Sequence, residues 1–243
     1  MMPEPKTVWL PIFLMLIGCA SSQGFDRITM NEVLHVAPPA ISHTNSTENQ
    51  DGRLSTPLRL GIFFVNHDFP DRRSVQKLEW WATDREQLLY QLAPLRNEHI
   101  LTDAFVLMDA TLHGDNIREV KRVGARYGAD VVLIVDGVAA VDRYNNRYAW
   151  LYPTLLGAYL APGTQSDALV MVTGSLWAVR SEWHAPIQTV EGVSKVVGSA
   201  VSVEDSAALL EAKQQAIQAL ARRVVDQLRL LGKELSHTTS SSR

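Results

Sequence analysis

The sequence predicts a single α/β domain with one mixed sheet, in the order β-α-β-α-β followed by a β-hairpin and a long C-terminal helix. Three apolar runs of strand length alternate with stretches whose apolar residues recur every three or four positions, the pattern of strands and amphipathic helices in one α/β unit. Two further β-rich segments and a closing helical stripe come after them. All these segments fall within residues 58–232 of the 243-residue chain, where we expect the folded domain.

The three strands of the first half are short apolar runs. Residues 58–65 form the first run, and Pro70 lies in the polar stretch that ends it. Residues 100–108 form the second. Residues 131–135 form the third and carry only aliphatic side chains, so we expect this strand to be central in the sheet and covered on both faces.

Two helices are predicted between these strands. Ser74 begins a helical stretch that Pro94 stops, because a helix interior needs the amide hydrogen that proline lacks. Asn116 is the expected N-cap of the second helix, and Gly128 stands where a left-handed residue ends it. The apolar positions of the first stretch keep a three-to-four spacing: Val75, Leu78, Trp81, Leu88, Leu89 and Leu92.

The second half predicts a hairpin and then a helix. Residues 169–179 and 187–197 are β-rich and are separated by a polar stretch, as in an antiparallel pair. Residues 202–205 resemble a capping box, and we expect the helix that follows to end at Gly232. Residues 233–243 are rich in serine and threonine, and we expect a disordered tail. The stripe of the helix is Leu210, Ile217, Leu220, Val224, Leu228 and Leu231.

The first eighteen residues are typical of a signal peptide. A polar stretch with Lys6 precedes an apolar run at residues 8–17, well short of the roughly 20 residues that a membrane-spanning helix needs. The run ends at Gly18-Cys19 and resembles the bacterial lipobox. That resemblance implies cleavage between Gly18 and Cys19, diacylglycerol on the Cys19 thiol and an acyl group on the new amino terminus. Ala20, in place of aspartate, implies the outer membrane. The alternative is an ordinary buried thiol in an N-terminal apolar helix.

Residues 19–57 are predicted to be the lipidated N-terminus and a flexible tether. They are rich in serine, threonine, asparagine and proline, a composition that does not support a packed core. One island at residues 25–36 carries Phe25, Ile28, Val33 and Leu34 and is a candidate to dock on the domain.

Composition excludes several classes of protein. The formal net charge is −3, and nothing in the charge pattern predicts nucleic-acid binding. The chain has one cysteine, which excludes an intrachain disulfide, a CxxC redox pair and a cysteine-rich zinc site.

No catalytic motif is present. The sequence lacks the GxSxG elbow, the phosphate loop, the dinucleotide fingerprint and the HExxH helix, and its seven histidines are scattered. We therefore expect no enzyme activity, no catalytic residues, no metal and no cofactor other than the covalent lipid on Cys19.

The best candidate for a pocket is the loop after the first strand. His67, Asp68 and Asp71 follow that strand at the sheet edge where α/β proteins place ligands; the alternative is a polar turn. His113 and Asp115 are expected at a helix entry. Asp130 and Asp136 bracket the third strand, and we expect them to contact turn backbone.

Residues 148–162 form a nearly unbroken apolar segment. Pro153 and Gly157 interrupt it, and it is too short to span a bilayer as a helix. Burial in the domain core is one interpretation. The other is an exposed element that meets a partner, another copy or the membrane surface, for which Trp150, Tyr152 and Tyr159 suit an interface.

Four stretches resemble the family of rhombotarget lipoproteins: residues 57–62, 125–131, 151–164 and the strand that ends at residues 177–181. The resemblance implies a lipid-anchored protein on the cell surface or in the periplasm, in a family without an assigned activity. The C-terminal residues 236–243 depart from the glycine-containing sorting signal of that family, so processing there is not implied.

Three functions follow as hypotheses. The first is a non-catalytic interaction or assembly module of the cell envelope, held to the membrane by lipid and binding an envelope protein or another copy of itself. The second is an envelope ligand-binding domain or hydrolase that uses the loop from His67 to Asp71. The third is an oligomeric export pore, for which only the hairpin at residues 169–197 is arguable, and its length is marginal.

Overall fold

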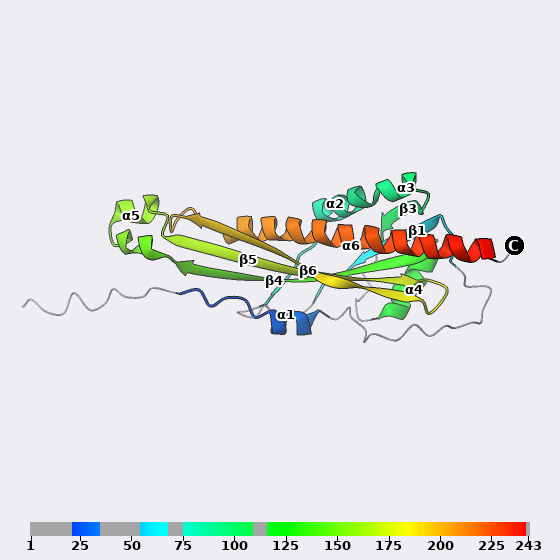
Figure 1. Cartoon of the computed structure of the whole chain (residues 1–243). Coiled ribbons are helices and arrows are strands. Elements are labelled where there is room, and N and C mark those ends of the chain that lie inside the picture. Colours follow the sequence, from blue (N-terminus) through cyan, green and yellow to red (C-terminus); the bar gives the residue numbers. More distant parts are fainter. Residues whose placement is uncertain (1–20, 35–53, 68–74, 109–115, 242–243) are drawn as a thin grey trace, which may run out of the picture.

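A computed structural model of the chain describes residues 21–34, 54–67, 75–108 and 116–241. Its centre is one mixed sheet with the strand order β3-β1-β4-β5-β6, and the short β2 pairs with β4. This confirms the predicted α/β fold with a β-hairpin and a long C-terminal helix (Figure 1). The strands are β1 Leu58–Phe64, β2 Gln76–Lys77, β3 Leu101–Val106, β4 Val131–Asn145, β5 Thr164–Ala178 and β6 His184–Gly198.

The sheet has a parallel part and an antiparallel arm. β1 runs parallel to β3 and to the first residues of β4, from Val131 to Val135. β4, β5 and β6 are each 15 residues long and antiparallel to one another. The β4–β5 ladder continues to the pair Asn145–Thr164, far beyond the last pair with β1. The three long strands therefore extend as an arm from the parallel part (Figure 1).

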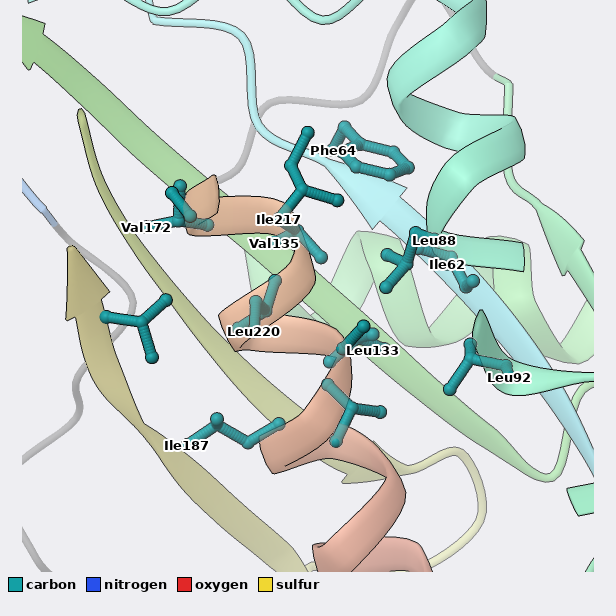
Figure 2. Close-up of a cluster of buried hydrophobic side chains, with 14 of the residues drawn as sticks. Ile62, Phe64, Leu88, Leu92, Leu133, Val135, Val172, Ile187, Ile217 and Leu220 are labelled. Atoms are coloured by element: carbon teal, nitrogen blue, oxygen red, sulfur yellow. The ribbon is translucent and has the colours of Figure 1, made fainter. Parts of the chain in front are cut away.

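One face of the sheet is covered by α2 (Ala82–Leu92) and α6 (Asp205–Ser241), with α3 (Pro94–Asn97) after α2. Figure 2 shows Ile217 and Leu220 of α6 above the strand residues Leu133 and Val135. All four side chains are almost completely buried, and they belong to the largest apolar cluster of the domain. The buried face of α6 therefore packs against strands of both the parallel part and the arm.

The opposite face is covered by two shorter helices. α4 (Ile117–Arg126) packs Val120 and Val123 against the parallel part. α1 (Arg27–Val33) packs Met30 and neighbouring Leu34 against the middle of β4 and β5. The prediction that an N-terminal island docks on the domain is thus confirmed for residues 25–34.

Both predicted ends of the second helix, α4, are confirmed. The Asn116 side chain accepts a hydrogen bond from the Glu119 amide at 3.3 Å, which caps α4. Gly128 has φ of +72°, the left-handed conformation expected after this helix.

The helix predicted from Ser74 is wrong in its first part. Gln76 and Lys77 form β2, which pairs with Val138 and Ala139 of β4, and α2 begins only at Ala82. Leu78 and Trp80 are buried in this extended stretch and share the large cluster. The apolar residues of this stretch fit helical spacing, but the stretch is extended, and the backbone of Gln76 and Lys77 pairs with the edge of β4.

The predicted end of the C-terminal helix is also wrong. α6 passes through Gly232 and continues to Ser241, so residues 233–241 are helical where a disordered tail was expected. A glycine inside a helix costs about 1 kcal/mol relative to alanine. Ile100 contacts the Gly232 position, and Leu235 beyond it packs against the core, which favours continuation of the helix.

Candidate functional site

The connection between β4 and β5 is an ordered apolar tip at the end of the arm. We call residues 146–163 the tip; they contain the 3-10 helix η3 (Arg147–Leu151) and the short helix α5 (Leu155–Leu160). No residue of these two helices is buried. The expectation that this segment is buried in the core is therefore wrong. The exposed fractions of its large side chains are Trp150 74%, Leu155 85%, Leu156 75%, Tyr159 64% and Leu160 76%.

Polar contacts fix the backbone of the tip. The Asn146 side chain accepts from the Tyr148 amide at 2.8 Å and donates to the Pro162 carbonyl at 2.7 Å. The Thr154 hydroxyl accepts from the Gly157 amide at 2.9 Å and so caps α5. A Cβ on Gly157 would lie 1.9 Å from the Leu151 carbonyl oxygen, so this turn requires glycine. The apolar side chains are thus presented on a defined scaffold.

The three aromatic residues predicted for this segment have different roles. Trp150 and Tyr159 are exposed, as an interaction surface requires. Tyr152 is only partly exposed, and its hydroxyl lies 2.7 Å from the Thr164 hydroxyl at the start of β5. A Cβ on Gly163 would lie 2.7 Å from the Tyr152 ring. Tyr152 therefore packs within the tip and connects it to the start of β5.

The predicted pocket residue His67 forms a pair with Asp136. His67 Nε2 lies 2.5 Å from Asp136 Oδ1, and the Asp136 side chain is fully buried. His67 follows the carboxyl end of β1, whereas Asp136 lies in β4 just beyond its last pair with β1. Asp68 and Asp71, which the sequence placed in the same pocket, lie outside the described residues, as do His113 and Asp115.

The two aspartates that bracket the predicted third strand have distinct partners. Asp130 accepts from the Arg59 amide at 2.8 Å, so it does contact backbone, although of a strand rather than a turn. Asp136 contacts the imidazole of His67. A carboxylate that orients an imidazole is found both in general bases and in purely structural pairs.

The residues near the His67–Asp136 pair in the chain, Val65 and Gly137, contact the extended stretch before α2. Trp80 Nε1 donates to the Val65 carbonyl at 2.9 Å, and a Cβ on Gly137 would lie 2.6 Å from Leu78. Two shallow hollows of the described surface lie elsewhere, one beside α2 and α3 and one between α2 and α6. Neither His67 nor Asp136 lines them.

A buried ion pair between α6 and α2 was not anticipated from the sequence. Lys213 of α6 donates to Asp84 of α2 at 2.7 Å. Lys213 lies four residues before Ile217 and seven before Leu220, at core spacing on the helix. The sequence signal for this pair is a charged side chain, Lys213, within the apolar stripe of the C-terminal helix.

Membrane and metal features were also sought in the described part of the chain. Its helices include none that combines the length and apolar character of a membrane span. Within the same residues, no three histidine, cysteine, aspartate or glutamate side chains are grouped as metal ligands would be. Gly18 and Cys19, the predicted cleavage and lipidation site, lie outside the described residues.

Comparison with known proteins finds no matching family model and no matching curated protein. Similar solved structures include bacterial lipoproteins. Rare lipoprotein B from Shewanella oneidensis has a TM-score of 0.23 and 9% identity, covering 76% of this chain and 99% of its own. Lipoprotein GNA1162 from Neisseria meningitidis has a TM-score of 0.26 and 13% identity, and the match covers 71% of this chain and 99% of that protein. The hypothetical protein CT253 from Chlamydia trachomatis has a TM-score of 0.36 and 9% identity, and the match covers 70% of this chain and 96% of that protein.

Proposed function

We propose that this chain is a lipid-anchored lipoprotein of the bacterial envelope that acts as a non-catalytic interaction module through its apolar tip. Cys19 carries the lipid, and the outer membrane holds the protein with its domain in the periplasm or at the cell surface. The lipobox-like sequence at Gly18-Cys19 supports the anchor.

The exposed tip is the observation that carries the interaction role. Five of its large apolar side chains are each more than half exposed, on a backbone that specific hydrogen bonds hold in place. Contiguous exposed apolar surface of this kind marks sites that meet a partner or a membrane. A connection between two strands has no structural need for it, since a short polar turn would join β4 to β5.

The lipid anchor is tested by metabolic labelling with a palmitate analogue. Wild-type protein is expected to incorporate the label and to fractionate with membranes, whereas Cys19→Ser is expected to do neither. Incorporation of the label into Cys19→Ser would contradict the assignment of the lipid to Cys19.

The interaction role is tested with a photo-crosslinking amino acid in cells. Placed at Leu156 in the tip, it is expected to crosslink to lipid or protein. Placed at Tyr90, which is 77% exposed on α2, it serves as the matched control. Equal yields of crosslinked product at both positions would contradict a tip-specific role.

A second candidate is an envelope ligand-binding domain or hydrolase that uses the loop from His67 to Asp71. The pairing of His67 with a fully buried carboxylate supports it, because that carboxylate would fix the imidazole for proton transfer or ligand binding. Full retention of ligand binding and hydrolase activity in His67→Gln, across a screen in which the wild type gives a positive signal, would exclude this candidate.

A further inference from the structure

The N-terminal chain is fixed to the same end of the arm as the tip. The Asp142 carboxylate accepts from the Ser22 hydroxyl at 2.6 Å, the Gln23 amide at 2.9 Å and the Gly24 amide at 3.0 Å. Asp142 lies three residues before the end of β4 at Asn145, which at the usual rise per strand residue is about 10 Å. Ser22 is therefore held close to the base of the tip.

The direction of this N-terminal segment is also defined. Arg27, at the start of α1, binds Glu191 of β6, which lies at the level of Val138 through the pairs Met171–Glu191 and Val138–Met171. Toward the N-terminus the chain then reaches Asp142, four residues nearer the tip. Figure 1 shows this dark blue segment running from α1 toward the end of the molecule that carries α5.

This geometry limits where an anchor on Cys19 lies. Cys19 is two residues before Ser21, where the described chain begins, and two residues of extended chain reach at most about 7 Å. If Cys19 carries a lipid, this short reach ties the lipid to the tip end of the molecule.

The charge of the tip suits a lipid surface. Between residues 143 and 166 the only charged side chains are Arg143 and Arg147. Because the whole chain carries −3, subtracting these two positive charges leaves −5 on the rest. Arg147 lies over the Tyr148 ring at 5.0 Å, at the start of η3. Basic and aromatic residues beside aliphatic ones are the composition of an element that lies in the membrane interface.

We propose that the tip inserts its aliphatic and aromatic side chains into the interface of the same bilayer leaflet that holds the lipid on Cys19. The anchor and the tip then form two contacts at one end of the arm, and the long axis of the sheet stands away from the membrane. This inference rests on the proposed lipid anchor and names the lipid bilayer as the surface that covers the tip.

The test uses the purified, lipidated mature protein in vesicles of phosphatidylethanolamine and phosphatidylglycerol. The native chain has one cysteine, so Leu156→Cys introduces the one free thiol when Cys19 is lipidated, and this thiol receives an environment-sensitive fluorophore. Glu182→Cys is the matched control, because Glu182 is 98% exposed in the β5–β6 turn at the other end of the arm. Quenching by neutral acrylamide is expected to be several-fold weaker at position 156 than at position 182.

Three results would overturn this inference, and each leads to a different conclusion. Equal quenching at positions 156 and 182 in vesicles shows that the tip is in water, while the lipid anchor stands. Protection of position 156 in the unlipidated Cys19→Ser protein without vesicles shows that a second copy covers the tip. Labelling of Cys19 in the wild-type protein shows that its thiol is free, which contradicts the anchor itself.

Discussion

The ammonium of Lys213 lies 2.7 Å from Oδ2 of Asp84, and the two side chains are only 4% and 3% exposed. Lys213 also donates to the Glu79 carbonyl at 3.0 Å and lies 4.1 Å from the centre of the Trp81 ring. The same Asp84 oxygen accepts from the Trp81 amide at the start of α2. One buried ion pair thus joins the first turn of α2 to the middle of α6.

Removal of one partner of this pair is expected to destabilise the domain strongly. In Lys213→Met the Asp84 carboxylate stays buried without its counter-charge, and loss of one member of a buried pair costs about 3–5 kcal/mol. The measurement is urea unfolding of the mature chain with Cys19→Ser. The double variant Lys213→Met, Asp84→Asn is the control, because the neutral amide still accepts from the Trp81 amide. A double variant as unstable as Lys213→Met would show that lost packing, rather than the unpaired charge, dominates.

Substitution of Gly157 is expected to disorder the tip without unfolding the domain. In Gly157→Ala the new methyl group would overlap the Leu151 carbonyl oxygen, so α5 and its cap must shift. The two helices of the tip contribute no residue to the buried core, so the midpoint of global urea unfolding is expected to stay within error of wild type. Hydrogen exchange of the amides in residues 155–160 is expected to rise, and Ala158→Ser serves as the control. A large fall in the unfolding midpoint would mean that the tip stabilises the arm.

The pair of Glu98 and Arg229 predicts a pH-dependent contribution to stability. Arg229 donates two hydrogen bonds to the Glu98 carboxylate, at 2.6 and 2.9 Å, and so lowers the pKa of Glu98. A lowered folded-state pKa gives stability that is present above the ordinary glutamate value of about 4.3 and is lost as the pH falls through the folded pKa.

The variant that tests this linkage is Arg229→Gln. Its unfolding midpoint is expected to be slightly below wild type at pH 7, because the pair is exposed to solvent, and this difference is expected to shrink as the pH is lowered below the ordinary glutamate pKa. NMR titration is expected to give a higher pKa for Glu98 in Arg229→Gln than in wild type. A difference in stability that persists unchanged at pH 3 would contradict an electrostatic origin.

Local sequence patterns predicted the parallel part of the fold well. Apolar runs mark β1, β3 and the start of β4, and the Asn116 and Gly128 signals place the ends of α4. These features depend on residues close together in the chain. The predicted third strand stopped at Val135, however, although β4 continues to Asn145.

The missed half of β4 has a long-range cause. Asp136 interrupts the apolar run, but its carboxylate is accommodated inside the domain by His67, 69 residues earlier. Beyond it, Asp142 is satisfied by Ser22, Gln23 and Gly24, more than 110 residues away. A periodicity analysis sees only the polar residue and not the distant partner that allows it in a strand. The exposed state of the tip was undecided for the same reason, since burial depends on what the rest of the chain covers.

Loss of the Asp142 carboxylate is expected to release the N-terminal segment from the arm. In Asp142→Ala the Ser22 hydroxyl and the Gln23 and Gly24 amides lose their shared acceptor, whereas Met30 and Leu34 still pack against β4 and β5. Amide exchange is therefore expected to rise several-fold at residues 22–24 and to change little within α1. Arg143→Ala, at the adjacent exposed position of β4, is the matched control.

If the anchor position depends on this contact, Asp142→Ala in the lipidated protein also makes a Leu156→Cys label more accessible to acrylamide. If amide exchange at residues 22–24 is fast but the accessibility of the label at position 156 to acrylamide is unchanged, the tip contacts the bilayer independently of the N-terminal segment.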